Sequence, residues 1–224
     1  MVDRWWVTSA TMARPRSPRG RAREANLRLA DEYPDARCEL DHRNPFELLA
    51  ATILSAQCTD ERVNLVTPHL FAAYPDAASL AGADPSDVER IVHSTGFYRS
   101  KAANLIGMAS ALVERHGGEV PGDMVDLVAL PGVGRKTANV VRSVALGLPG
   151  LPVDTHVGRI VRRLGITTEE DPVKVEHVLN PLIPAGERGL FSLRLILHGR
   201  RVCASRRPRC DDCILADFCP SSHL

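Results

Sequence analysis

The sequence reads Leu130-Pro131-Gly132-Val133-Gly134-Arg135-Lys136-Thr137-Ala138 at the point that decides most about its fold. We expect a short helix before this segment and a second helix, rich in valine, after it. Gly132 and Gly134 permit positive φ and let a ligand approach the backbone without a Cβ in the way. The first turn of the second helix also directs unpaired N–H groups at the same place. The segment therefore suits a bound phosphate.

Two other phosphate-binding loops are excluded by spacing. The segment lacks the Gly-x4-Gly-Lys pattern of a Walker loop and the third glycine of a dinucleotide fingerprint. An ordinary turn between two helices, in which the glycines only make the connection, stays open as an alternative on geometry alone.

Helix signals dominate the rest of the chain. Asn44-Pro45, Asp84-Pro85 and Asp171-Pro172 each have the N-cap residue followed by proline that begins a helix. Apolar residues recur at helical spacing over 157–164, and strands with hairpin turns are not indicated anywhere. The sequence predicts an all-α protein of about ten helices.

Composition is that of an ordinary globular protein, with 44% hydrophobic and 25% charged residues. The longest stretch without Asp, Glu, Lys or Arg covers 13 residues, 63–75. A membrane-spanning helix needs about 20 residues, so we expect no membrane association.

Charge is distributed unevenly. The net charge is +5 over residues 1–28, −8 over 29–187 and +4 over 188–224. Two basic ends indicate a polyanionic partner, although a solubilising tail is an alternative. Arginine accounts for 25 basic residues and lysine for only three, Lys101, Lys136 and Lys174, so each lysine that is present invites a functional explanation.

We interpret residues 1–20 as a disordered basic arm. The arm lacks the apolar core of a secretory signal. An organellar transit peptide, and a true start at Met12, both stay open.

Four of the six cysteines lie within the last 22 residues, spaced as Cys203-x6-Cys210-x2-Cys213-x5-Cys219. A chain of this length does not need a disulfide scaffold, so a metal is the simpler interpretation. Only one Cys-x2-Cys pair is present, and spacing alone leaves zinc and an iron–sulfur cluster equally open.

Three features together carry a family resemblance. The segment Leu130–Ala138 resembles the helix-hairpin-helix of the base-excision DNA glycosylases, and Val153-Asp154-Thr155-His156 resembles the segment that follows it there. The 18-residue separation of Lys136 from Asp154, and the cysteine spacing, are similar to the endonuclease III family. The resemblance covers about Arg23 to Cys219.

The resemblance implies a fold of two helical domains with a cleft between them. A six-helix domain would cover residues 38–148, with the helix-hairpin-helix at about 123–147. A discontinuous iron–sulfur domain would combine residues 21–37 with 149–224, its [4Fe–4S] cluster held by Cys203, Cys210, Cys213 and Cys219. The arginines between 200 and 209 would face phosphates, which makes a structural cluster the expectation and an electron carrier the rival.

The family removes damaged pyrimidines from DNA and then cleaves the strand, which implies catalytic roles for Lys136 and Asp154. An amine that attacks a sugar C1′ must be neutral, and the helix N-terminus and Arg135 both disfavour the charged form of Lys136. Asp154 would stabilise the cationic C1′, and it is also a natural N-cap for the next helix. A lysine nucleophile, rather than water, predicts a bifunctional glycosylase and abasic-site lyase.

Further DNA contacts follow from the same resemblance. Gln57 would fill the gap left by an extruded base, and the exposed Phe97 would act as a second wedge. Backbone and side chains of the hairpin, and His156, would contact phosphates. The full expected DNA-binding set is Gln57, Phe97, Gly132, Val133, Gly134, Arg135 and His156.

We expect a monomer that acts on double-stranded DNA with a damaged base or abasic site. A bacterial protein of this kind would work in the cytoplasm, at the nucleoid, while targeting by the arm stays open. The alternatives are a mismatch or pyrimidine-dimer glycosylase of the same superfamily and a non-catalytic DNA-binding hairpin module. The mismatch adenine glycosylases fit less well, because they typically lack a lysine at position 136.

Overall fold

The computed structural model describes residues 14–224, and this part of the chain contains eleven α-helices, four 3-10 helices and no strand. The predicted all-α class is confirmed. Residues 1–13, which include most of the predicted arm and the alternative start at Met12, lie outside the described residues.

Helix α1 (Pro18–Glu32) begins earlier than predicted. The oxygen of Ser17 accepts a hydrogen bond from the N–H of Gly20, and Pro18 occupies the first helical position. Residues 18–20 are therefore helical, and the expectation that the disordered arm extends to residue 20 is wrong for these three residues.

A first helical unit follows, with one hydrophobic core that runs from Leu40 to Val141. It comprises α2 (Pro45–Leu54), α3 (Asp60–Ala73), α4 (Ala77–Ala81), α5 (Pro85–Val92), η1 (His93–Thr95), α6 (Tyr98–His116), α7 (Met124–Val128) and α8 (Arg135–Val144). These are seven α-helices where six were expected. The short α4 among them begins at a capping box formed by Asp76 and Ser79.

The predicted helix starts in both halves of the chain are confirmed. Asn44, Asp84 and Asp171 each cap a helix whose first residue is proline. In α2, for example, the side chain of Asn44 accepts from the N–H of Glu47 at 2.9 Å.

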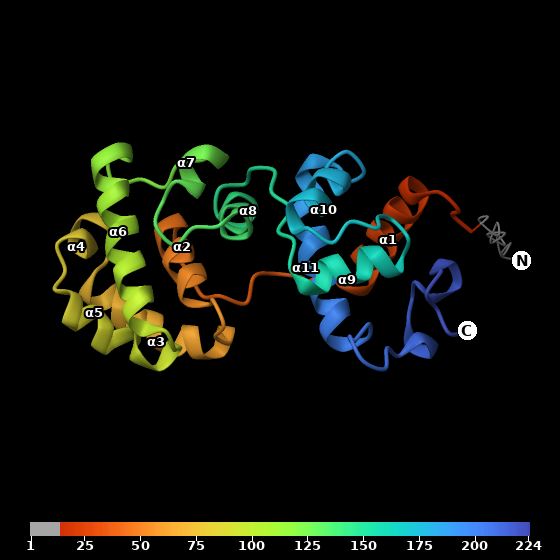
Figure 1. Ribbon diagram of the computed structural model, residues 1–224, viewed down its shortest axis with the longest axis horizontal. Helices are drawn as coiled ribbons and strands as arrows, with labels where there is room; N and C mark the ends of the chain where they lie inside the picture. Colours follow the sequence, from red (N-terminus) through yellow and green to blue (C-terminus); the bar gives the residue numbers. More distant parts are fainter. Residues whose placement is uncertain (1–13) are drawn as a thin grey trace, which may run out of the picture.

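A second helical unit has its own core. It comprises α9 (Thr155–Arg163), α10 (Pro172–Leu179), η2 (Ala185–Glu187), α11 (Arg188–Arg201), η3 (Cys210–Asp212) and η4 (Ala216–Phe218). Helix α1 packs into this core against α11, so the unit joins the two ends of the described chain (Figure 1).

Helix α8 lies between the rest of the first unit and the second unit (Figure 1). Polar contacts fasten it there. The Asn139 side chain accepts from the N–H of Leu151 at 3.2 Å and donates to the carboxylate of Glu176 at 2.9 Å. No helix among residues 14–224 has the length and apolar character required to cross a bilayer.

Candidate active site and nucleic-acid interface

The two glycines of the hairpin between α7 and α8 have different roles. Gly132 has a φ of +75°, and a Cβ there would lie 2.8 Å from the Cβ of Asn104, so only glycine fits. Gly134 is the N-cap of α8, with no side-chain cap and with open space where a Cβ would be. The backbone N–H groups at the start of α8 are therefore accessible to an anion.

The side chains of Val133 and Arg135, on either side of Gly134, both contact other parts of the protein. Val133 is buried in the first core, so only its backbone is available to a ligand. The guanidinium of Arg135 donates to Glu176 on α10 at 2.7 and 2.9 Å, and the hydrogen bond to that carboxylate raises the pKa of Arg135. The structure thus directs Arg135 across to the second unit.

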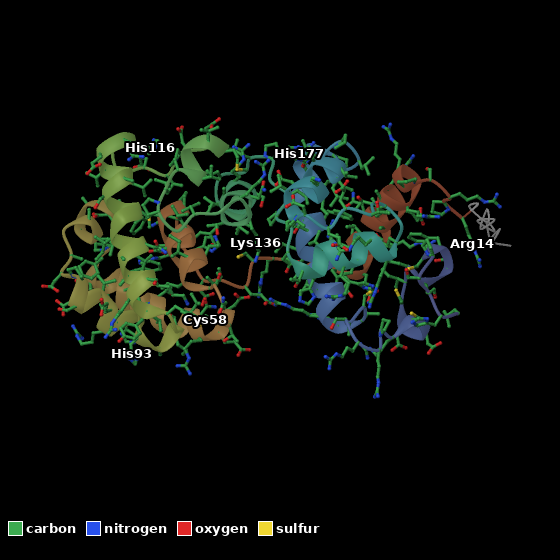
Figure 2. All side chains as sticks on the ribbon, viewed as in Figure 1. Arg14, Cys58, His93, His116, Lys136 and His177 are labelled. Atoms are coloured by element: carbon green, nitrogen blue, oxygen red, sulfur yellow. The ribbon has the colours of Figure 1, made fainter. Side chains whose placement is uncertain are left out.

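Lys136 is exposed in the first turn of α8, and Figure 2 places it between the two helical units. Asp154 is the N-cap of α9, its carboxylate accepting from the N–H of Val157 at 2.9 Å. Both residues line a cavity of about 120 Å³ whose walls come from both units. No ion pair within 4.0 Å joins Lys136 to a carboxylate of the described residues.

The same two residues also line a second, more open cavity of about 560 Å³. His156 and Arg200 contribute to its wall. Arg200 lines both cavities. Its guanidinium pairs at 2.5 Å with Glu39, just before the first unit, and at 3.6 Å with Asp60, the first residue of α3. Lys136, Asp154 and Arg200 therefore line both cavities.

His156 is half-buried and linked to the neighbouring loop. Its Nδ1 lies 3.2 Å from a guanidinium nitrogen of Arg159, which also donates to the carbonyls of Gly199 and Cys203. A Cβ at Gly199 would lie 2.6 Å from His156 Nδ1, so the ring rests directly on that backbone. His156 thus connects the wall of the second cavity, through Arg159, to the cysteine-rich loop of residues 203–219.

Gln57 and Phe97 meet at a separate place. Both line a shallow cavity of about 240 Å³, together with Asn104 of α6 and Gly132 of the hairpin. Their side chains are exposed, that of Phe97 to 68%. Both residues have left-handed backbones, with φ of +54° and +48°, a conformation that is costly for residues other than glycine.

The four C-terminal cysteines gather around one small cavity of about 30 Å³. All four are free thiols. A guanidinium nitrogen of Arg163 lies 3.2 Å from Cys203 Sγ, and His198 Nε2 lies 3.4 Å from Cys213 Sγ. The four sulfur atoms thus line one cavity, and Arg163 of α9 and His198 of α11 lie beside two of them.

The chemistry of this donor set fits a cationic group. Burial, followed by the charges of the neighbouring cysteines, raises the pKa of the Cys213 thiol to about 11. A thiolate there needs a compensating positive charge, which bound metal supplies. No three Cys, His, Asp or Glu side chains in residues 14–224 converge as ligands of a single ion. A cluster with one thiolate on each iron does not require such convergence.

Sequence reasoning did not identify two residues that shape the site. Lys101 donates to the main-chain carbonyls of Leu54 and Thr95, and the only signal for it was the scarcity of lysine. Glu176, which holds Arg135 and Asn139, gave no local signal because its partners lie far away in the sequence.

Comparison with known proteins defines the class. Residues 50–185 match the model of the HhH-GPD superfamily of base excision DNA repair proteins. This range includes the hairpin, Lys136 and Asp154.

Whole-chain similarities narrow the class to one family. The chain is 52% identical to endonuclease III of Synechocystis sp. over 96% of its length and 98% of the relative, and 46% identical to that of Bacillus subtilis over 86% and 88%. A solved noncovalent endonuclease III–DNA complex matches with a TM-score of 0.85 and 43% identity, covering 91% of this chain and 95% of the other. The chain belongs to the endonuclease III family.

Proposed function

We propose that this protein excises damaged pyrimidines from double-stranded DNA and cleaves the abasic site through a covalent intermediate on Lys136. The activity class, a DNA glycosylase with abasic-site lyase activity, is that of its family. The observation that carries the residue assignment is the meeting of Lys136 and Asp154 at one cavity between the two units.

Substrate binding begins at phosphates. The accessible N–H groups at the start of α8 and the exposed arginines of the cysteine-rich loop address the backbone. Extrusion of the damaged nucleotide costs a few kcal/mol of stacking. Gln57 and Phe97, exposed on one cavity, fill the space that the base leaves in the duplex.

Base excision then occurs at C1′ of the sugar. The bond between C1′ and the base nitrogen breaks, and its electron pair leaves with the base. The carboxylate of Asp154 stabilises the positive charge on C1′ while the Lys136 amine, in its neutral form, forms a bond to that carbon. The amine proton passes to Asp154 or solvent.

Strand cleavage follows from the same bond. The sugar ring opens to give a protonated imine between Lys136 and C1′, which makes the C2′ proton acidic. Loss of that proton forms a double bond as the 3′ phosphate leaves, and water then hydrolyses the imine to release Lys136. A trapped covalent intermediate has been solved for a DNA complex of endonuclease III, 43% identical to this chain.

We further propose that Cys203, Cys210, Cys213 and Cys219 hold a [4Fe–4S] cluster. Their grouping around one cavity supports this assignment. The cluster fixes the loop that carries Arg206, Arg207 and Arg209 toward DNA, and no step of the reaction above requires it. We expect a monomer acting at the nucleoid of a bacterial cytoplasm.

Borohydride trapping on an abasic duplex tests the assignment, because hydride reduces the imine to a stable amine. Wild type should give one protein–DNA adduct, Lys136→Gln none, and the control Lys174→Gln as much as wild type. Lys174 lies in α10 and is largely exposed. An undiminished adduct in Lys136→Gln would refute the nucleophile, and wild type that binds but never cleaves would indicate the non-catalytic alternative.

A further inference from the structure

Lys101 is a lysine whose amine is buried. Only 4% of the residue is exposed, and its Nζ donates to the carbonyl of Leu54 at 2.8 Å and to that of Thr95 at 2.7 Å. Leu54 is the last residue of α2 and Thr95 the last of η1. The ammonium therefore satisfies carbonyls at two helix ends, where a positive charge is favoured.

In the sequence, the two acceptor residues closely precede the two site residues whose backbone is left-handed. Gln57 follows Leu54 by three positions, and Phe97 follows Thr95 by two. Among the described residues other than glycine, positive φ occurs only at Gln57, Phe97 and Arg207. Conformations of this kind persist where the surrounding structure holds them.

The lysine and the two left-handed residues line the same cavity. Lys101, Gln57 and Phe97 line it together, Lys101 as a buried residue and the other two as exposed residues. A single ammonium thus joins the end of α2 to the end of η1 by two short hydrogen bonds. Without it, two buried carbonyls would lose their donor and the two loops their common anchor.

We propose that Lys101 is a positioning residue that sets the spacing of Gln57 and Phe97 and thereby controls extrusion of the damaged base. This inference rests on the function proposed above. Lys101 does not itself bond to DNA, because its amine is buried and two of its three hydrogens are donated to the main chain. Its effect should appear only where a base must leave a duplex.

Two substrates separate positioning from chemistry. The first is a duplex with one dihydrouracil, which must be extruded, and the second is a single-stranded oligonucleotide with one abasic site, which need not be. Single-turnover rates are measured for wild type, Lys101→Met and the control Lys174→Met. Lys101→Met should be at least about tenfold slower on the duplex and within about twofold of wild type on the single strand. Lys174→Met should match wild type on both.

A double variant shows whether the effect passes through the wedge. In a Phe97→Ala background, adding Lys101→Met should slow the duplex reaction by less than about threefold, since coupled residues are not additive. A full additional tenfold loss would overturn the inference.

Folding is checked by thermal unfolding of each variant. If Lys101→Met does not fold, Lys101→Gln, which keeps N–H donors, takes its place in both assays. Loss of folding in both variants, equal losses on the two substrates, or no loss at all would overturn the positioning role while leaving the proposed function intact. A wild type that cleaves neither substrate would overturn both.

Discussion

The guanidinium of Arg135 donates two hydrogen bonds, at 2.7 and 2.9 Å, to the carboxylate of Glu176 across the boundary between the two helical units. The residue next to Arg135 is Lys136, so this pair fixes the helix turn that carries the amine. The two partners differ in environment, since the side chain of Glu176 is 6% exposed and that of Arg135 is 35% exposed.

That difference predicts unequal costs of breaking the pair. Arg135→Gln leaves a buried carboxylate without its main partner and should lower the free energy of unfolding by about 3 kcal/mol. Glu176→Gln leaves an arginine that can turn toward water and should cost about 1 kcal/mol. Urea titration measures both, with exposed Glu169→Gln as a control expected to change stability by less than about 0.5 kcal/mol. Equal costs for the two variants would contradict this account.

Asp154 serves as both helix cap and catalytic carboxylate in our proposal, and two variants separate these roles. Asp154→Asn keeps a good N-cap and should leave stability nearly unchanged while slowing base excision about 100-fold. Asp154→Ala should slow base excision by the same factor and should also lower the free energy of unfolding by about 1 kcal/mol. Single-turnover excision and urea titration provide the two measurements. An Asn variant with the wild-type rate would remove Asp154 from the chemistry.

The cysteine-rich loop predicts a brown protein with about four iron atoms per chain. Cys213→Ala should lose the iron and the colour, whereas Cys38→Ala, outside the loop, should retain both. Metal analysis and visible absorbance measure this. One zinc and no iron in the wild type would refute the cluster.

DNA affinity should fall steeply with salt, because the proposed contacts are to phosphates. Replacing the exposed Arg206 and Arg207 together with glutamine should weaken binding and reduce the slope of log affinity against log salt by between about 1 and 2. Fluorescence anisotropy between about 50 and 200 mM salt measures the slope. Arg115→Gln, at the far end of α6, serves as the control and should leave the slope unchanged.

Acid should weaken the fold partly through Glu47, at the start of α2. Burial alone raises the pKa of this carboxyl, but hydrogen bonds and charge from Arg43 outweigh burial and hold the pKa below its ordinary value of 4.5. A lowered carboxyl pKa contributes stability that is present above pH 4.5 and lost as the pH falls through the folded-state value. Glu47→Gln should therefore lose less stability between neutral pH and low pH than wild type in urea titrations. An unchanged acid slope would contradict the assignment.

Local chemistry explains which parts of the fold the sequence predicts well. Asn44, Asp84 and Asp171 mark helix starts because an N-cap bonds only to its own first turn. Ser17-Pro18 carries the same signal, but its position within a run of arginines favoured a disordered interpretation. The hairpin and the cysteine-rich loop give clear patterns because their residues are close together in the sequence.

Tertiary partners explain what the sequence did not predict. The acceptors of Lys101 and the bond between Arg135 and Glu176 join residues that only the fold brings together. The place of Arg135 in the hairpin predicts a DNA contact, whereas its acidic partner on α10 gives no signal near it in the sequence. Lys136 and Asp154 were predicted together only through a family resemblance, since neither position indicates the other.

The placement of α1 also bears on how the protein is made. The first core, from Leu40 to Val141, uses only residues that leave the ribosome in one continuous stretch, so it can complete while synthesis continues. Helix α1 emerges earlier still, but its core includes Leu215 and Phe218, which are translated long after it and after the whole of the first core. Ala22, Ala25 and Leu29 therefore wait for their packing partners until the whole of the first core has been synthesised, a period in which a chaperone could cover them.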